Sequence, residues 1–294
     1  MRRLMFLVLL AGGLFILLRP LSGSFGSAPL LRAPAMLNRA GAMNILVLGL
    51  DRRATEVPRS DTIVVVHVGP GTAPTLLSIP RDLWVPIPTH GDDRINTAYT
   101  WGELNGGQGA ALARRTVEQN FGVAIDRVVV IDFACFQQAV DAAGGITVQI
   151  DQQLFDPTHP LTGGQATPLT FEAGPRKLNG EEALQFARLR APDSDFGRIR
   201  RQHQVLEALG ERARDPQVAL RVARMVMRQC PTSGLDLTPA DLVTLSSLAS
   251  RSGDPRIRLI DESMVNPTTL PSGAQVLLPR WELIRPLAAD LLTN

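Results

Sequence analysis

The chain has 294 residues, of which 45% are apolar and 20% are charged, a balance that excludes a disordered protein and supplies enough apolar side chains for a core. The formal net charge of +2 excludes the strong positive field that is typical of nucleic-acid-binding proteins. Lys177 is the only lysine, so almost all of the basic charge is arginine.

The first segment of the chain, 4–18, is a run of fifteen apolar residues behind two arginines. Fifteen residues are short for a bilayer crossing, which needs roughly 20. The run also fits the apolar core of a signal peptide with cleavage near Ser27. No clear small-x-small cleavage site follows at once, and we favour an uncleaved signal-anchor helix over 1–19. In either case the arginines hold the N-terminus in the cytoplasm and leave the rest of the chain outside. Residues 20–42, rich in Gly, Ser, Pro and Ala, predict a linker.

Three strands are predicted next, over 44–50, 62–68 and 75–79. If the first two are antiparallel and the turn at 69–74 makes a hairpin, three strand ends meet at one sheet edge. The charged residues that would gather there are Asp51, Arg59, Asp61, Arg81 and Asp82. Two carboxylates at such an edge can hold Mg²⁺, whereas the alternative is that strand-end aspartates cap turns.

The rest of the chain alternates helices and strands. Residues 87–97 predict a loop with a solvent-facing His90, and 151–178, with four prolines, predict an irregular flap. Further helices are predicted over 109–121, 133–143, 179–190, 197–214, 216–229, 238–250 and 279–292, and further strands over 127–131, 146–150, 256–260 and 275–278. Antiparallel strand pairs among helices predict an α/β fold, a three-layer α/β/α domain around a central mixed sheet.

The stretch 188–202, RLRAPDSDFGRIRRQ, holds five arginines. A capping box of Asn179 and Glu182 would start the helix that leads into it, and Gln202 lies one turn after Arg198 on the next helix. Guanidinium groups suit phosphate oxygens because they donate two hydrogen bonds in one plane, and a helix N-terminus favours anions. The alternative is a solvated surface with internal Asp–Arg pairs, and spacing alone leaves both open.

Several common sites are excluded. The two cysteines, Cys135 and Cys230, have no metal-ligand spacing, which rules out a zinc site. We expect two buried thiols, and the alternative is a disulfide between them if the domain is exported. The chain has no P-loop, no GxGxxG after a strand and no GxSxG elbow. The residues alone thus indicate an exported α/β protein with an anion site.

Seven blocks occur in order: NILVLGLDRR, RSDTIVVV, LLSIPRDLWVPIP, DRINTAYTWG, VDAAGGITVQI, LNGEEALQFARLR and DSDFGRIRRQ. Together they resemble the LytR–CpsA–Psr family of bacterial cell-wall phosphotransferases, over about residues 44–214. The resemblance implies transfer of a glycopolymer, with one phosphate, from a polyprenyl-pyrophosphate carrier to a cell-wall acceptor such as peptidoglycan. It also implies Mg²⁺ at the pyrophosphate and an apolar pocket for the lipid.

The resemblance further implies roles for residues at the matching positions. Asp51 and Asp61 would hold the metal, Arg53 and Asp82 would support the site, and Asp195 would orient the arginines or activate the acceptor. The pyrophosphate would be bound by Arg59, Arg81, Arg188, Arg190, Arg198 and Gln202. The catalytic set would be Arg81, Arg188, Arg190, Asp195 and Arg198.

One departure stands in the arginine stretch, where Ala191-Pro192 replaces a histidine often found in the family. Proline stiffens this loop, so we expect a different loop shape and acceptor choice. The resemblance places the catalytic domain at 43–214 and leaves 215–294 as a C-terminal helical extension on the same domain. We expect a single-pass protein of the cell membrane whose partners are the lipid-linked donor, the wall acceptor and the membrane, with no nucleic acid. Two alternatives remain, a polyprenyl-pyrophosphate hydrolase and a non-catalytic lipid- or wall-binding module.

Overall fold

The computed structural model describes residues 42–51, 57–160, 166–189, 195–230, 236–237, 241 and 256–292. The predicted anchor helix over 1–19 lies outside these residues, as does the linker except for Ala42. The predicted helix over 238–250 also lies outside them, apart from Asp241. In the described part of the chain, every helix is too short or too polar to cross a bilayer.

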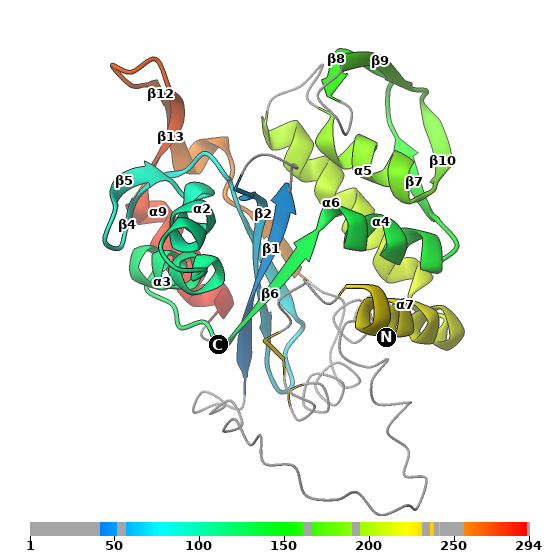
Figure 1. The fold of residues 1–294 in the computed structure, drawn as a ribbon, viewed down its shortest axis with the longest axis horizontal. Coiled ribbons are helices and arrows are strands. Elements are labelled where there is room, and N and C mark those ends of the chain that lie inside the picture. The colour runs from blue at the N-terminus through cyan, green and yellow to red at the C-terminus, as the bar shows by residue number, and fades with distance from the viewer. Residues whose placement is uncertain are drawn as a thin grey trace, which may run out of the picture.

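A five-stranded sheet forms the middle layer of the molecule (Figure 1). Its strands, in spatial order, are β11 (Arg256–Leu259), β3 (Thr75–Ile79), β2 (Arg59–Val68), β1 (Met43–Asp51) and β6 (Arg127–Asp132). The pairs β1–β2 and β2–β3 are antiparallel, whereas β1–β6 and β3–β11 are parallel. The predicted mixed sheet and its first two antiparallel pairings are therefore confirmed.

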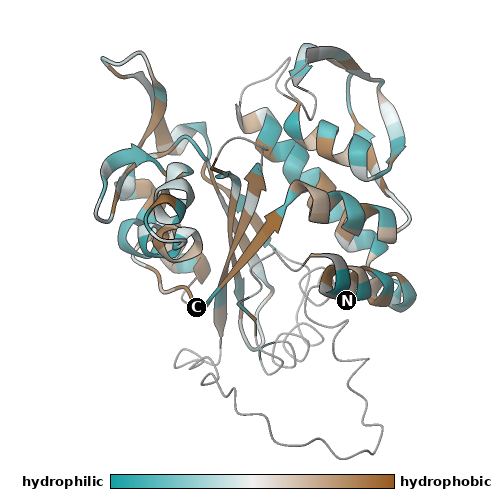
Figure 2. Ribbon diagram, viewed as in Figure 1, coloured by the Kyte–Doolittle hydropathy of each residue, from teal (hydrophilic) through white to brown (hydrophobic). Residues whose placement is uncertain are grey.

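One face of this sheet packs on the helices α2 (Thr97–Leu104), α3 (Gly109–Phe121) and α9 (Trp281–Leu292). Leu46, Leu48 and Leu50 of β1 point to this side and are fully buried. Successive side chains of a strand point to opposite faces, so the odd-numbered residues of β1 face the other way. Figure 2 shows the apolar character of these central strands.

The opposite face is covered by α4 (Phe133–Ala142), α5 (Gly180–Arg188), α6 (Asp195–Arg212) and α7 (Pro216–Gln229). These helices also bury a second apolar core of their own, which includes Phe171 and Phe186. The molecule therefore has helices on both faces of its sheet, as Figure 1 shows, and the predicted three-layer α/β/α architecture is confirmed.

In the described part of the chain four two-stranded ribbons accompany the sheet, and three of them correct the sequence-based predictions. They are β4 (Trp84–Ile87) with β5 (Gly91–Arg94), β7 (Ile146–Ile150) with β10 (Gly174–Leu178), β8 (Leu154–Pro160) with β9 (Ala166–Phe171), and β12 (Val265–Thr269) with β13 (Gln275–Pro279). The short 3-10 helix η1 (Glu262–Met264) directly precedes β12. Residues 87–97 are not simply a loop, since 84–94 form a hairpin whose turn holds Thr89 at φ 68°. Residues 151–178 are largely strand, because a two-stranded ribbon has open edges that tolerate proline.

The expectation of two free buried thiols is wrong. Cys135, in the first turn of α4, forms a disulfide with Cys230, directly after α7, and their Cα atoms are 5.5 Å apart. The two cysteines are 95 residues apart in sequence, and only the packing of α7 against α4 brings them together. The bond therefore fastens the helical layer that covers the second face of the sheet.

Candidate functional site

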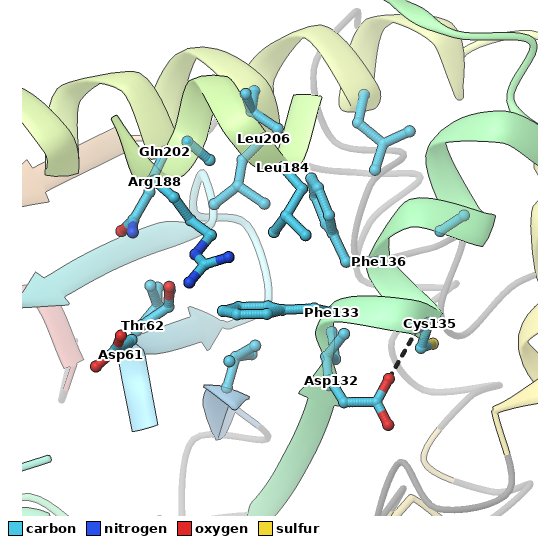
Figure 3. Close-up of a pocket in the computed structure, with 18 of the residues that line it drawn as sticks. Asp61, Thr62, Asp132, Phe133, Cys135, Phe136, Leu184, Arg188, Gln202 and Leu206 are labelled. Atoms are coloured by element: carbon cyan, nitrogen blue, oxygen red, sulfur yellow. Dashed lines mark hydrogen bonds between the residues drawn. The ribbon is translucent and has the colours of Figure 1, made fainter. Parts of the chain in front are cut away.

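A cavity of about 180 Å³ lies between the sheet and the layer of α4–α7. Most of its wall is apolar, contributed by both layers. The apolar lining residues are Val47, Val64, Val66, Leu76, Ile131, Phe133, Phe136, Ala139, Leu184, Ala187, Val205, Leu206, Leu209, Val222 and Val226. Figure 3 shows how Phe133, Phe136, Leu184 and Leu206 converge on this space.

The polar part of the lining contains six of the predicted site residues: Asp51, Asp61, Arg81, Arg188, Arg198 and Gln202. We call these six residues the charged mouth. They come from β1, β2, the turn after β3, α5 and α6, so distant parts of the chain supply them. The structure therefore brings together carboxylates, guanidinium groups and an apolar chamber in one site.

The predicted sheet edge is confirmed. Asp51 lies opposite Arg59 at the end of the β1–β2 ladder, and Asp61 Oδ2 lies 3.0 Å from Arg81 Nη1. The ladder shifts register between Gly49 and Leu50. Gly49 is required here because a Cβ atom at this position would lie 2.9 Å from the Cβ of Thr62 on β2.

Arg188 is held at the C-terminal end of α5. The predicted capping box starts this helix, with the Glu182 amide donating to Asn179 Oδ1 at 2.9 Å and the Asn179 amide donating to Glu182 Oε2 at 3.1 Å. Arg188 Nη2 lies 3.5 Å from Asp51 Oδ2, and the guanidinium carbon lies 4.7 Å from the centre of the Phe133 ring (Figure 3). An aromatic face attracts a cation, so Phe133 helps to place this arginine.

Helix α6 supplies Arg198 and, one turn later, Gln202, and both line the cavity as their predicted common face requires. Arg198 is only 5% exposed, which is unusual for an arginine. Arg201 is buried as well, and its Nη2 donates to the Leu189 carbonyl at 2.6 Å, which joins α6 to the end of α5. The arginine stretch is therefore partly a buried site and not merely a solvated surface.

The other predicted site residues lie elsewhere. Arg59 is exposed and does not contribute to the described cavity lining. Asp82 lies behind Arg81, with its Oδ2 3.2 Å from Arg81 Nε. Arg53 and Arg190 lie outside the described residues, and Asp195 begins α6 with its side chain outside the description.

The sequence-based predictions assigned no role to three residues, Asp132, Phe133 and His203. Asp132 lines the cavity and caps α4, where its Oδ1 accepts from the Cys135 amide at 2.8 Å, and Phe133 underlies Arg188. Asp132 is the last residue of β6, which runs parallel to β1, and this position at a strand end is a signal that could have placed it beside the sheet edge. His203 of α6 shares a hydrogen bond with Ser78 of β3, and burial lowers the pKa of this imidazole to about 4.

The model of the LytR_cpsA_psr family matches residues 28–272. The chain is 36% identical, over 219 residues, to a protein of Oceanobacillus iheyensis named polyisoprenyl-teichoic acid–peptidoglycan teichoic acid transferase TagU, a match that covers 70% of this chain and 65% of the relative. The match thus spans slightly less than two thirds of that transferase.

Two solved structures share the fold. TagT bound to LIIa-WTA aligns with a TM-score of 0.65 at 25% identity, over 86% of this chain and 91% of that one. The LytR-CPS2A-psr family protein YwtF (TagT) with bound octaprenyl pyrophosphate lipid aligns with a TM-score of 0.60 at 23% identity, again over 86% and 91%. The family model covers more than half of the sequence, and the three-layer fold agrees with these structures. The chain therefore belongs to the LytR–CpsA–Psr family.

Proposed function

We propose that this protein is a Mg²⁺-dependent phosphotransferase, which moves a glycopolymer with one phosphate from a polyprenyl-pyrophosphate carrier to a cell-wall hydroxyl, such as one in peptidoglycan. A single observation carries the proposal: one cavity has an apolar chamber and, in the same lining, the charged mouth. The donor has the same two parts, a hydrocarbon tail and a pyrophosphate. The name of the TagU relative and the lipid bound to the TagT structure support this donor class.

The apolar chamber suits a prenyl tail. Each methylene that leaves water contributes roughly 0.8 kcal/mol, so a long tail supplies most of the binding energy without any polar contact. The wall extends along α6 from Arg198 to Leu209, a rise of roughly 16 Å at 1.5 Å per residue. A tail that follows this helix would leave its pyrophosphate at the arginines.

The charged mouth suits a pyrophosphate with a hard cation. Arg81, Arg188 and Arg198 offer planar forks that match phosphate oxygens, and Gln202 adds an amide. Asp51 and Asp61 fit Mg²⁺, which takes one or two protein carboxylates and completes its shell with water and phosphate oxygens. Among the described residues no cluster of three or more His, Cys, Asp or Glu side chains is placed to hold a metal. In the proposal, water and the phosphate oxygens of the donor supply the other ligands. Bound Mg²⁺ would neutralise charge on the pyrophosphate oxygens.

The proposed reaction exchanges one P–O bond for another. The acceptor hydroxyl oxygen bonds to the phosphorus that carries the sugar, the bond from that phosphorus to the bridging oxygen breaks, and prenyl monophosphate leaves. The arginines stabilise the charge that develops on the bridging and equatorial oxygens, which is the main demand of phosphoryl transfer. Asp195 is our candidate to orient these arginines or to accept the hydroxyl proton.

The decisive experiment uses the full-length chain in detergent with a prenyl-pyrophosphate-linked sugar, and with either Mg²⁺ or EDTA. Lipid products are followed by mass spectrometry, with and without peptidoglycan. We expect prenyl monophosphate only with Mg²⁺, and sugar phosphate on the peptidoglycan. Free sugar phosphate at the same rate with or without peptidoglycan would mean a hydrolase. Tight lipid retention without cleavage would mean a binding module.

We also propose that the segment 1–19 anchors the protein in the cell membrane, with the N-terminus inside and the site outside. The donor lipid lies in the same membrane, so an anchor keeps the enzyme near its substrate. Protease added to intact cells should digest the large domain. Protection of that domain in intact cells, with digestion after lysis, would contradict this orientation.

A further inference from the structure

A chain of side-chain contacts leads from the charged mouth to the C-terminal hairpin β12–β13. Arg81 Nε lies 3.2 Å from Asp82 Oδ2, while the other carboxylate oxygen, Asp82 Oδ1, lies 3.3 Å from Arg94 Nε. Arg94 in turn donates to the backbone carbonyl of Gln275 on β13, at 2.7 Å from Nη2 and 3.2 Å from Nε. Three side chains therefore connect the cavity to a fixed backbone group.

The backbone at Arg81 is held from two sides as well. The Asn96 amide, just after β5, donates to the Arg81 carbonyl at 3.2 Å, and the Leu277 amide of β13 donates to the Asp82 carbonyl at 3.0 Å. Leu83, fully buried, forms an isolated parallel bridge with Leu277. The hairpin β12–β13 thus acts as an extra strand pair beside the turn that carries Arg81.

We propose that Arg94 is a positioning residue for Arg81, and that the hairpin β12–β13 belongs to the catalytic unit because it fixes Arg94. This rests on the proposed function, since it concerns an arginine assigned to the pyrophosphate. Asp82 accepts from Arg81 and so sets the plane of its guanidinium, Arg94 holds Asp82, and the Gln275 carbonyl holds Arg94. Gln275 lies beyond residue 272, where the family-model match ends, so the match does not carry this contact.

Arginine suits this position better than lysine would. Both nitrogens of its rigid fork, Nε and Nη2, donate to the Gln275 carbonyl while Nε also forms the ion pair with Asp82, whereas an ammonium is a point donor on a flexible stem. Arg94 is partly exposed, with 30% of its side chain accessible, and its hydrogen bonds to the Gln275 carbonyl lie at the surface. The variant R94Q therefore removes both the positive charge and the fork, whereas R94K keeps the charge and removes only the fork.

The test measures kcat and KM of full-length wild type, R94Q and R94K with the prenyl-pyrophosphate-linked sugar and Mg²⁺. We expect R94Q to lower kcat roughly 10- to 100-fold, because a misplacement of about 1 Å in a catalytic group can cost that much, and R94K to fall between R94Q and wild type. In the variant D82N the ion pairs that link Arg94 to Arg81 are already lost. The double variant D82N/R94Q should therefore have the same kcat as D82N. A wild-type kcat in R94Q, or a double variant that loses the full product of both effects, would overturn the proposal.

The matched control is R280Q. Arg280, directly after β13, also donates to a backbone carbonyl, that of Ser263 at 3.0 Å, and its side chain pairs with Glu282, with Arg280 Nε 3.3 Å from Glu282 Oε1. R280Q should lower the thermal midpoint about as much as R94Q while keeping the wild-type kcat. An equal loss of kcat in R280Q would mean that hairpin stability alone matters, which would overturn the positioning role.

Binding of inorganic pyrophosphate, measured by calorimetry, separates this inference from the proposed function. R94Q should weaken pyrophosphate binding several-fold relative to R280Q, whether or not the protein turns over a lipid donor. No turnover in wild type, with weakened pyrophosphate binding in R94Q, would refute the transferase and keep the positioning role. Equal pyrophosphate affinity in wild type and R94Q would refute the positioning role.

Discussion

Arg188 and Asp51 meet at the cavity although 137 residues separate them in sequence, with Arg188 Nη2 3.5 Å from Asp51 Oδ2. The nearby pair of Arg81 and Asp61 repeats this arrangement at 3.0 Å. Opposite charges thus lie close together in the charged mouth. We expect an incoming pyrophosphate to draw the arginines toward its oxygens and to leave the two carboxylates free for a cation.

Replacing Arg188 by alanine should reduce turnover at least roughly 100-fold, or about 2.7 kcal/mol of transition-state stabilisation, because a guanidinium donor to the pyrophosphate is lost. Release of prenyl monophosphate measures this effect. Arg224 is an exposed arginine of the neighbouring helix α7, so R224A serves as the control and should behave as wild type. Wild-type turnover in R188A would remove Arg188 from the site.

The variants D51N and D61N should each shift the Mg²⁺ dependence of turnover to higher concentration, at least roughly tenfold, because an amide is a neutral and weaker ligand for a hard cation. A Mg²⁺ titration at fixed donor concentration checks this. The variant D92N, which neutralises an exposed carboxylate of the β4–β5 hairpin, is the control. An unchanged titration in D51N or D61N would exclude that carboxylate from the metal site.

Leu209→Trp should discriminate between donors of different tail length. Leu209 lines the cavity about three turns along α6 from Arg198, so the larger ring would fill the distant part of the chamber. We expect KM to rise for a long-tailed donor and to stay unchanged for a short-tailed donor in the same protein. Overpacking costs typically 1–3 kcal/mol, so the folded fraction should be verified by thermal unfolding. An equal rise of KM for both donors would argue against a tail along α6.

Stability should fall as the pH drops from about 6.5 to about 4, because of His203. Burial lowers the pKa of this imidazole from 6.5 to about 4 in the folded state, so between these values the unfolded chain binds a proton that the folded chain does not. The full effect is on the order of 3 kcal/mol, since one pKa unit corresponds to about 1.4 kcal/mol. Urea unfolding at pH 7.5 and pH 4.5 measures it. The variant H203Q should lose much less stability over this pH interval. A loss equal to that of wild type would mean that His203 does not cause the pH dependence.

Removing the disulfide should destabilise the domain by roughly 2–5 kcal/mol, because a cross-link between residues 95 apart restricts the unfolded chain. The double variant C135A/C230A, compared with wild type in urea, tests this. Reductant should lower the stability of wild type and leave the double variant unchanged. Equal stability of the two proteins would mean that the bond contributes nothing.

Local sequence determined the three strands β1, β2 and β3 and the sheet edge that they form. The runs of Val, Ile and Leu specify β1, β2 and β3, and the short turn between the last two forces them into a hairpin. Once that hairpin exists, Asp61 and Arg81 must lie at the same edge, so spacing was sufficient to predict their proximity. The capping box at Asn179 is equally local, and so is the face that Arg198 shares with Gln202.

Only the tertiary structure decided which long-range partners meet. The disulfide between Cys135 and Cys230 depends on how α7 packs on α4, and the position of Phe133 under Arg188 depends on how α5 packs on α4. The same holds for Arg94 and the Gln275 carbonyl, 181 residues apart. No local pattern encodes such pairs, because they result from burying the apolar faces of the helices against one sheet, a condition that the whole chain satisfies at once.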